Sequence, residues 1–334
     1  TFMDFQEYCR NSKVGVDTNN IENIFSMAEI LDECNITSVI LKDKKVNIKK
    51  ILDDIRFWLW KIYHQCPPLD KKRGFKVKGT AEYRRFFSFL HDKGLGSRLT
   101  VVTTNYDLIF EYFAWEANLS CAYPFSISNV EPLSFMEKTT DGTDRERYVV
   151  LSSGETQLLV CKLHGSVNYF EINSFKKGQR DLKVKVANEV GLVNESVGNS
   201  LFPTDRPALF AVDALWKIKQ NDSNLEHAII PPTYAKLRQK EWLRDIWCKA
   251  LTQLSEAKVI VFIGYSMPES DGFMKAMLRV AMAQRKTKEV PRIYVINPDK
   301  KCFDNYKNLF KDIKIICWEK SFISSIDELK GVIS

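Results

Sequence analysis

The sequence predicts an α/β protein whose core is a doubly wound, mostly parallel sheet. Short apolar runs that lack polar alternation, such as 258-KVIVFI-263 and 292-RIYVI-296, are typical of strands buried on both faces. Stretches with apolar residues at helical spacing lie between several of these runs. This alternation of strands and helices favours a parallel sheet covered by helices on both sides.

Residues 1–98 are expected to form a mostly helical N-terminal layer that packs on the sheet. Apolar residues recur at helical spacing over residues 21–31 and again over residues 48–62. A third helix is expected around residues 86–90, and the glycines of 93-KGLG-96 are a typical helix stop.

The strands and helices of the expected core follow in order along the chain. Strand-like runs occur at 99–103, 158–163, 258–263, 292–296 and 313–317, and helix-like stretches at 107–117, 241–257 and 270–284. We therefore assign residues 99–121, 158–170 and 229–334 to a Rossmann-like core. Residues 122–157 and 171–228 are polar and punctuated by Pro and Gly, and they are expected to form an irregular inserted cap.

The composition excludes several classes of protein. A content of 45% hydrophobic and 27% charged residues is typical of a globular protein, and the longest apolar runs are too short to span a membrane. The eight cysteines are scattered without a C-x-x-C pair, which excludes a zinc ribbon and indicates reduced thiols in a cytoplasmic protein. The basic runs 42–50, 71–78 and 175–185 are explained by solvated surfaces, and a nucleic-acid or acidic-partner surface is the alternative.

Small or polar residues follow four of the expected strands. Ligands of open α/β sheets bind beyond the carboxyl ends of the strands, so these residues are candidates for a site. Three of the four ends contain a polar residue able to bond a ribose hydroxyl or a phosphate. The four segments are 103-TTNYD-107, 162-KLHGS-166, 264-GYSMPESD-271 and 296-INPD-299.

Each of these residues also has a structural explanation. Asn105 and Asp107 suit the cap of the helix that follows them, and Gly264 suits a tight turn. His164 can be a satisfied polar residue at a strand end. The chain's one G-x-G sequence, residues 94–96, precedes a strand instead of following one, which is the wrong context for a dinucleotide fingerprint.

The ordered set of four segments resembles the sirtuin-like family, and more narrowly the sirtuin-like domains of bacterial anti-phage defence proteins. The phrase 229-IIPPT-233 ahead of a Trp-bearing helix fits that branch as well. The resemblance implies an NAD glycohydrolase that converts NAD and water to nicotinamide and ADP-ribose. It also implies a role as an abortive-infection effector against phage.

The resemblance assigns roles to individual residues. Asn105 and His164 match the catalytic asparagine and histidine, and Asp107 matches the acid that holds the nicotinamide carboxamide. The remaining positions assigned to NAD binding are Thr104, Gly165, Gly264, Ser266 and Asn297. Cleavage of the nicotinamide–ribose bond builds positive charge on the sugar, so a near-neutral imidazole that accepts a proton from a ribose hydroxyl assists it.

This chain departs from the family pattern in three ways. A strand with a glycine-rich phosphate loop is missing, and we expect about 30–60 further residues before Thr1 to supply it. The four-cysteine zinc module of the deacylating sirtuins is also missing, so no zinc is expected. The 58 residues between Asn105 and His164 form a longer insertion than in those enzymes.

Two other functions stay open, an NAD or ADP-ribose sensor without turnover and, with less support, an NAD-dependent protein deacylase. A homo-oligomer is expected through the N-terminal helices, because their aromatic residues exceed what one helix stripe can bury. These residues are Trp58, Trp60, Phe86, Phe87 and Phe89. The activating partner is expected to be an ATPase, a nucleic-acid-sensing subunit or a phage-derived trigger.

Overall fold

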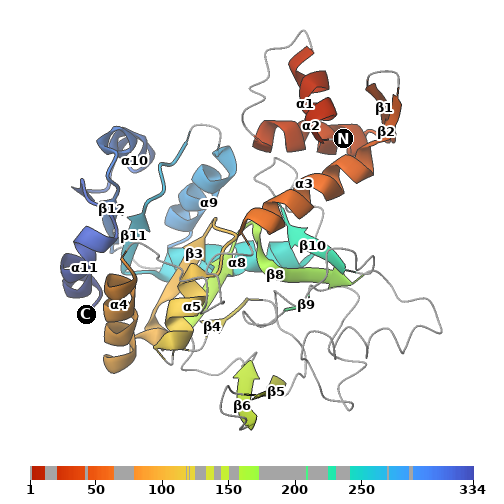
Figure 1. Cartoon of the computed structure of the whole chain (residues 1–334). Helices are drawn as coiled ribbons and strands as arrows, with labels where there is room; N and C mark the ends of the chain where they lie inside the picture. Colours follow the sequence, from red (N-terminus) through yellow and green to blue (C-terminus); the bar gives the residue numbers. More distant parts are fainter. Residues whose placement is uncertain are drawn as a thin grey trace.

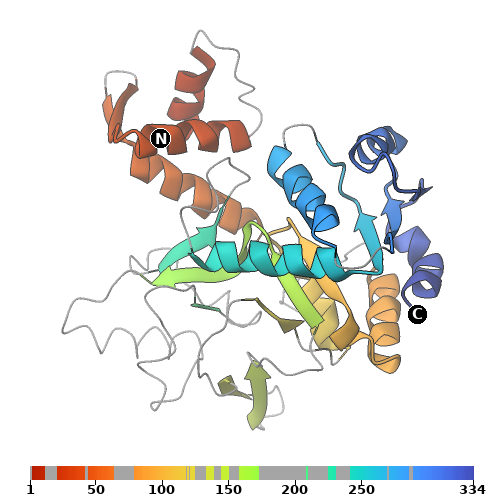
Figure 2. The same cartoon turned by 180° about the vertical axis from the view of Figure 1, so that it is seen from behind.

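The structure is a computed structural model, shown in Figure 1 and, turned by 180°, in Figure 2. It describes residues 2–11, 21–41, 44–63, 79–117, 119, 121–124, 133–138, 144–149, 158–172, 208–209, 225–230, 241–268, 271–285 and 289–334. The basic runs 71–78 and 175–185, and Pro231, Pro232 and Thr233 of the phrase IIPPT, lie outside these residues.

The N-terminal elements form a cluster that stands apart from the parallel core in both views (Figure 1, Figure 2). The cluster consists of α1 (Phe2–Asn11), α2 (Ile21–Glu33), α3 (Ile48–Tyr63) and the antiparallel hairpin β1 (Ser38–Leu41) and β2 (Lys44–Asn47). The structure confirms the two helices predicted here, whereas the hairpin was not expected. Trp60 ties α3 to the rest of the chain, because its Nε1 donates to the main-chain oxygen of Val167 at 3.2 Å.

A first parallel sheet has the strand order β3 (Thr100–Thr103), β7 (Leu158–Lys162), β4 (Cys121–Ala122). Helix α5 (Ile109–Glu116) follows β3, and α4 (Thr80–Asp92) packs against it. Helix α4 ends where the sequence predicted, and Gly94 takes a φ of 60° just beyond it. That left-handed conformation is the one that glycine adopts at a helix end without strain.

A second parallel sheet has the order β11 (Val259–Ile263), β12 (Arg292–Ile296), β13 (Ile315–Trp318). Helix α9 (Gly272–Ala283) connects β11 to β12, and α10 (Phe303–Leu309) connects β12 to β13. The chain then ends in α11 (Ile326–Ile333), which packs against α4. Short 3-10 turns lie at Gly96–Arg98, Lys300–Cys302 and Ile323–Ser325.

The two parallel sheets are halves of one layered core, because they share an apolar cluster on each face. On one face, Val102 of β3 and Ile260 of β11 pack in the cluster that α8 (Glu241–Glu256) and α9 cover. On the other face, Val101 and Val261 pack in the cluster that α4, α5 and α11 cover. Side chains of consecutive strand residues point to opposite faces, which explains this division. The mixed α/β, Rossmann-like class predicted from the sequence is confirmed.

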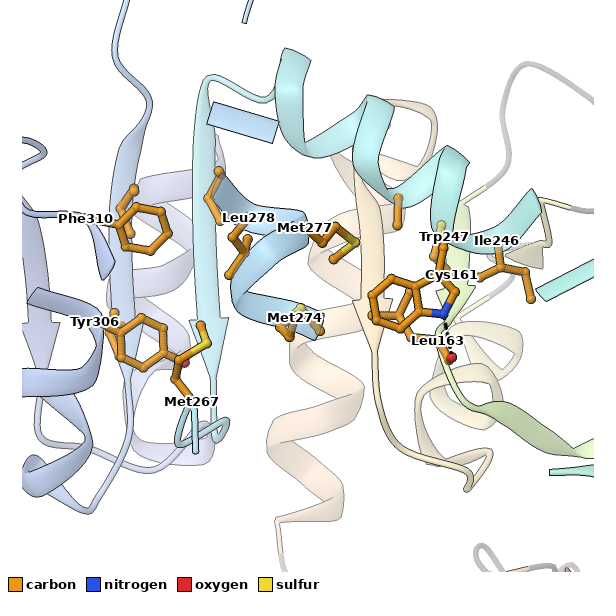
Figure 3. Close-up of a cluster of buried hydrophobic side chains, with 14 of the residues drawn as sticks. Cys161, Leu163, Ile246, Trp247, Met267, Met274, Met277, Leu278, Tyr306 and Phe310 are labelled. Carbon is orange, nitrogen blue, oxygen red and sulfur yellow. Dashed lines mark hydrogen bonds between the residues drawn. The ribbon is translucent and has the colours of Figure 1, made fainter. Parts of the chain in front are cut away.

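Figure 3 shows the first of these clusters as a continuous row of side chains. The row runs from Trp247 of α8 through Met274 and Met277 of α9 to Tyr306 of α10 and Phe310 just beyond it. Leu163, just beyond β7, and Met267, beyond β11, lie in the same row of side chains.

Part of the two inserted ranges is regular. Strand β8 (Gly165–Ile172) begins in the expected core and extends into the second inserted range, and it pairs antiparallel with β10 (Leu225–Ile229) and β9 (Ala208–Leu209). Strands β5 (Leu133–Lys138) and β6 (Asp144–Val149) form an antiparallel hairpin. None of the described helices is long and apolar enough to cross a membrane.

Candidate functional site

The segment that follows β3 presents Asn105 at the surface. The main-chain N–H of Asn105 donates to Thr103 Oγ1 at 3.0 Å, and the residue is exposed, while Thr104 is half-buried. Asp107 Oδ1 accepts the main-chain N–H of Ile109 at 3.0 Å. One carboxylate oxygen of Asp107 therefore has the helix-capping role that the sequence also allowed.

The chain after β7 holds this segment in place. Thr103 and Lys162 are register partners of the parallel β3–β7 pair, and Leu163 N–H donates to Thr103 O at 2.9 Å. Tyr106 O accepts both the N–H of Val167 at 3.1 Å and the hydroxyl of Ser166 at 3.3 Å. The structure thus brings Asn105 and His164 to neighbouring strand ends.

His164 is buried at the point where the chain reverses. Only 4% of its surface is exposed, and Gly165 provides the reversal with a φ of 78°. The imidazole lies near two aromatic rings, with centroids 6.2 Å from Tyr106 and 6.5 Å from Trp247. The main-chain oxygen of His164 accepts a hydrogen bond from the N–H of Ile230 at 2.8 Å. Burial and these neighbours restrict the orientation of the ring.

Trp247 is fixed from the neighbouring helix. Its Nε1 donates to Leu163 O at 2.9 Å, the dashed line in Figure 3. Trp247 lies in the helix-like stretch predicted over residues 241–257, but helical spacing alone gives no indication of its contact with the candidate site.

A buried ion pair lies beneath the segment that carries Asn105. Lys162 Nζ is 2.9 Å from Glu111 Oε1, with the two side chains 1% and 4% exposed. Tyr123 Oη donates to the same oxygen at 3.4 Å. Burial and the nearby Glu111 charge together raise the pKa of the Cys121 thiol and of the Tyr169 hydroxyl. These neighbours therefore stay protonated at neutral pH.

The predicted site residues of the second sheet form a separate group at its carboxyl edge. Gly264 follows β11 with a φ of 67°, and both it and Ser266 are exposed. The main-chain oxygen of Ser266 accepts a hydrogen bond from Nδ2 of Asn305 at 3.1 Å. The next residue, Met267, is fully buried. The turn after β11 is thus anchored while its polar side chain faces solvent.

Asn297 links this turn to the end of β12. Its Nδ2 donates to Tyr265 O at 3.3 Å, and its Oδ1 accepts the N–H of Asp299 at 2.9 Å. An amide group has two donor hydrogens and two acceptor lone pairs, so one of each remains for a ligand. Asn297 is buried, so much of its role in this structure is to hold the turn.

The predicted residues therefore fall into two groups. Asn105, Asp107 and His164 lie at the end of the first sheet, and Ser266 and Asn297 lie at the end of the second. That both groups line one cleft stays a prediction. No group of three or more side chains able to hold a metal ion occurs within the described ranges.

Sequence reasoning missed two charged residues at this place, Lys162 and Glu111. Lys162 is the one charged residue in the apolar run 158-LLVCKL-163, and a lysine inside a buried strand is the signal that could have identified it. Glu111 carried no such signal, because an acidic residue in the first turn of a helix is ordinary.

Comparison with known proteins identifies the family. The model of the SIR2-like domain matches residues 99–326, which is more than half of the chain. A search of curated proteins found no match. The matched range begins one residue before β3 and includes all the predicted site residues. Proteins of this family are generally NAD-dependent enzymes. The chain belongs to the SIR2-like family.

Proposed function

We propose that the chain binds NAD along the carboxyl ends of β3, β7, β11 and β12 and hydrolyses it to nicotinamide and ADP-ribose. The observation that supports the proposal is the β3–β7 register, in which Asn105 and His164 follow neighbouring strand ends. The SIR2-like match supports NAD as the substrate class. No step of this hydrolysis needs a redox partner, because water is the co-reactant.

The proposed reaction begins with loss of nicotinamide. The bond between the ribose carbon and the nicotinamide nitrogen breaks, and its electron pair leaves on that nitrogen. The exposed amide of Asn105 is suited to order a ribose hydroxyl and the attacking water. His164 accepts a proton from a ribose hydroxyl and so raises electron density at the sugar. Water then bonds to the ribose carbon and releases a proton to solvent, and His164 returns its proton to the ribose oxygen.

The second sheet is suited to the adenosine side of NAD. Gly264 leaves room for close approach, since an added Cβ would meet nothing within 4 Å. The exposed Ser266 and the remaining donor and acceptor of Asn297 are groups that bind a phosphate or a ribose hydroxyl.

We also propose that the NAD-cleaving activity serves bacterial anti-phage defence. The resemblance of the four strand-end segments to such proteins supports this role. Depletion of NAD would be harmful in an uninfected cell, so the activity is expected to await a trigger. Oligomerisation, a partner subunit or a phage component would provide it.

A second candidate is a module that binds NAD without cleaving it. The observation in its favour is the 4% exposure of His164, since a general base must reach the substrate hydroxyl. A buried imidazole near two aromatic rings also fits a structural role.

The experiment uses the full natural protein, incubated with NAD with and without an acyl-lysine peptide. Chromatography of nicotinamide and ADP-ribose, together with calorimetry of NAD binding, separates the candidates. Hydrolysis without peptide supports the proposed function, and release of nicotinamide only with peptide indicates a deacylase. Binding without turnover, also in the presence of candidate triggers, would establish the sensor.

A further inference from the structure

Lys162 places a charged group inside an apolar layer. In β7 it shares a face with Leu158, which packs in the cluster that α4 and α5 cover. Its side chain is 1% exposed. An ammonium buried in such a layer lowers the stability of the fold unless it is paired and hydrogen-bonded. The groups that pair with Lys162 therefore determine what it can do.

The partners of Lys162 come from two places in the chain. Glu111 of α5 supplies the opposite charge, with Nζ and Oε1 2.9 Å apart, and the main-chain oxygen of Asp107 accepts a hydrogen bond from Nζ. The second oxygen of Glu111, Oε2, has no hydrogen-bond partner within the part of the chain that the structure describes. A buried pair of this kind often adds no more stability than apolar side chains of the same volume.

The contact with Asp107 gives the pair a positional role. Thr103 O is held by the N–H of Leu163, and Asp107 O is held by Nζ of Lys162. Two consecutive residues at the end of β7, Lys162 and Leu163, thus bind both ends of the five-residue segment whose middle residue is Asn105. Without the Lys162 contact, this end of the segment would be held from outside only at Tyr106, by Val167 and Ser166.

We propose that Lys162 is a positioning residue, which fixes the segment 103–107 so that the amide of Asn105 faces the same substrate as His164. This inference rests on the proposed function for its catalytic consequence. Glu111 neutralises the buried ammonium and keeps it aimed at Asp107. Lys162 itself is too deeply buried to touch a substrate.

The test replaces the pair by apolar side chains of similar volume, Lys162→Met with Glu111→Leu in one protein. The control is Lys307→Met with Asp304→Leu, an exposed pair whose Nζ–Oδ1 distance is also 2.9 Å. Melting temperature, hydrogen exchange of a peptide covering residues 103–109, NAD binding and NAD hydrolysis are measured on the natural full-length proteins.

The melting temperature of the double variant of the buried pair is expected to lie within a few degrees of that of the wild type. Replacing both residues leaves no unpaired charge in the interior. Its amides in segment 103–109 are expected to exchange faster, and kcat is expected to fall about 10–100-fold with KM nearly unchanged. The control is expected to match the wild type in exchange and in kcat. If the wild type binds NAD without cleaving it, the proposed function fails while the exchange result still decides the inference.

A well-folded double variant with wild-type exchange and turnover would overturn the positioning role. Should that variant not fold, the decision passes to Glu111→Gln, which keeps an acceptor for Nζ and leaves the contact with Asp107. This variant is expected to keep protected amides and turnover within about threefold. A much larger loss of turnover at an unchanged melting temperature would show that the charge pair, not the contact with Asp107, sets the activity.

Discussion

Asn105 and His164 each lie two residues beyond one register pair, Thr103 and Lys162, of the parallel strands β3 and β7. Equal spacing from a shared register pair means that the two residues leave the sheet at the same level. A shift of one residue in this pairing would move both side chains to other positions. The strand register is therefore as important for the candidate site as the identity of its side chains.

His164→Ala is expected to remove NAD hydrolysis while the protein stays folded. A general base contributes about 10²–10⁴-fold to rate, and the histidine lies just beyond the end of β7. His91→Ala is the matched control, because His91 is an exposed histidine in the last turn of α4. Nicotinamide release and melting temperature are measured on the same preparations.

Asn105→Ala is expected to have a similar effect, and the double variant should be little worse than either single one. Residues that act on one transition state as a unit do not contribute additively. Hydrolysis retained in a well-folded His164→Ala protein would leave His164 with a structural role. A strictly additive loss in the double variant would separate the roles of the two residues.

Gly264→Ala is expected to destabilise the turn after β11. Its φ of 67° lies in the left-handed region, where a residue with a Cβ is disfavoured by about 1 kcal/mol, although nothing lies within 4 Å of the added atom. Gly272→Ala is the control, since Gly272 begins α9 with equally open space and no left-handed φ. Thermal melts should show a decrease for the first variant and an unchanged or higher value for the second. Equal melting temperatures would contradict the assigned turn.

The thiol of Cys161 is expected to make stability depend on alkaline pH. Burial raises its pKa from 9.0 to about 12, so the folded chain keeps the proton when the unfolded chain has lost it. This contribution is fully present below pH 9 and is lost as the pH rises from 9 toward 12, by about 1 kcal/mol at pH 10.

Denaturant titrations at pH 7.5 and at about pH 10 test this dependence by comparing the wild type with Cys161→Ala. The difference in unfolding free energy between the two proteins is expected to become smaller at the higher pH. Cys34→Ala is the control, because an exposed thiol meets similar solvent in the folded and unfolded chain. A difference for Cys161→Ala that does not change with pH would argue against the shift.

The N-terminal cluster is proposed to contribute the contacts of a homo-oligomer, with Trp58 in them. Of the aromatic residues first considered, Trp60, Phe86 and Phe87 are buried within the chain and Phe89 is half-buried, whereas Trp58 is 48% exposed. Trp58→Ser should therefore lower the oligomeric state seen by light scattering, and Val290→Ser, at a 60% exposed residue, should not. A wild type that is monomeric at micromolar concentration would refute the proposal.

The strands and their order along the chain could be predicted because each core strand is a continuous apolar run. The run 292-RIYVI-296 coincides with β12, and α3 starts at Ile48, where the helical spacing begins. The hairpin β1–β2 escaped prediction because 44-KKVN-47 is mostly polar and its partner strand is only four residues long. Short polar strands are stabilised by pairing, which a local pattern does not reveal.

The candidate site was predictable only in part. Strand ends in a parallel sheet are natural ligand positions, so Asn105 and His164 could be selected without coordinates. The Lys162–Glu111 pair could not, because it joins residues that are far apart in sequence through a packing arrangement. The burial of His164 under Tyr106 and Trp247 is likewise a tertiary effect.

The separation of strand partners along the chain has a kinetic consequence. Strands β11, β12 and β13 are joined by connections of 28 and 18 residues, whereas 54 residues lie between the end of β3 and the start of β7. Closing the longer connection costs about 1 kcal/mol more than closing the shortest one, and distant pairings slow folding. During refolding, the C-terminal half is therefore expected to reach its native form first, and the β3–β7 pairing beside Asn105 and His164 is expected to form last.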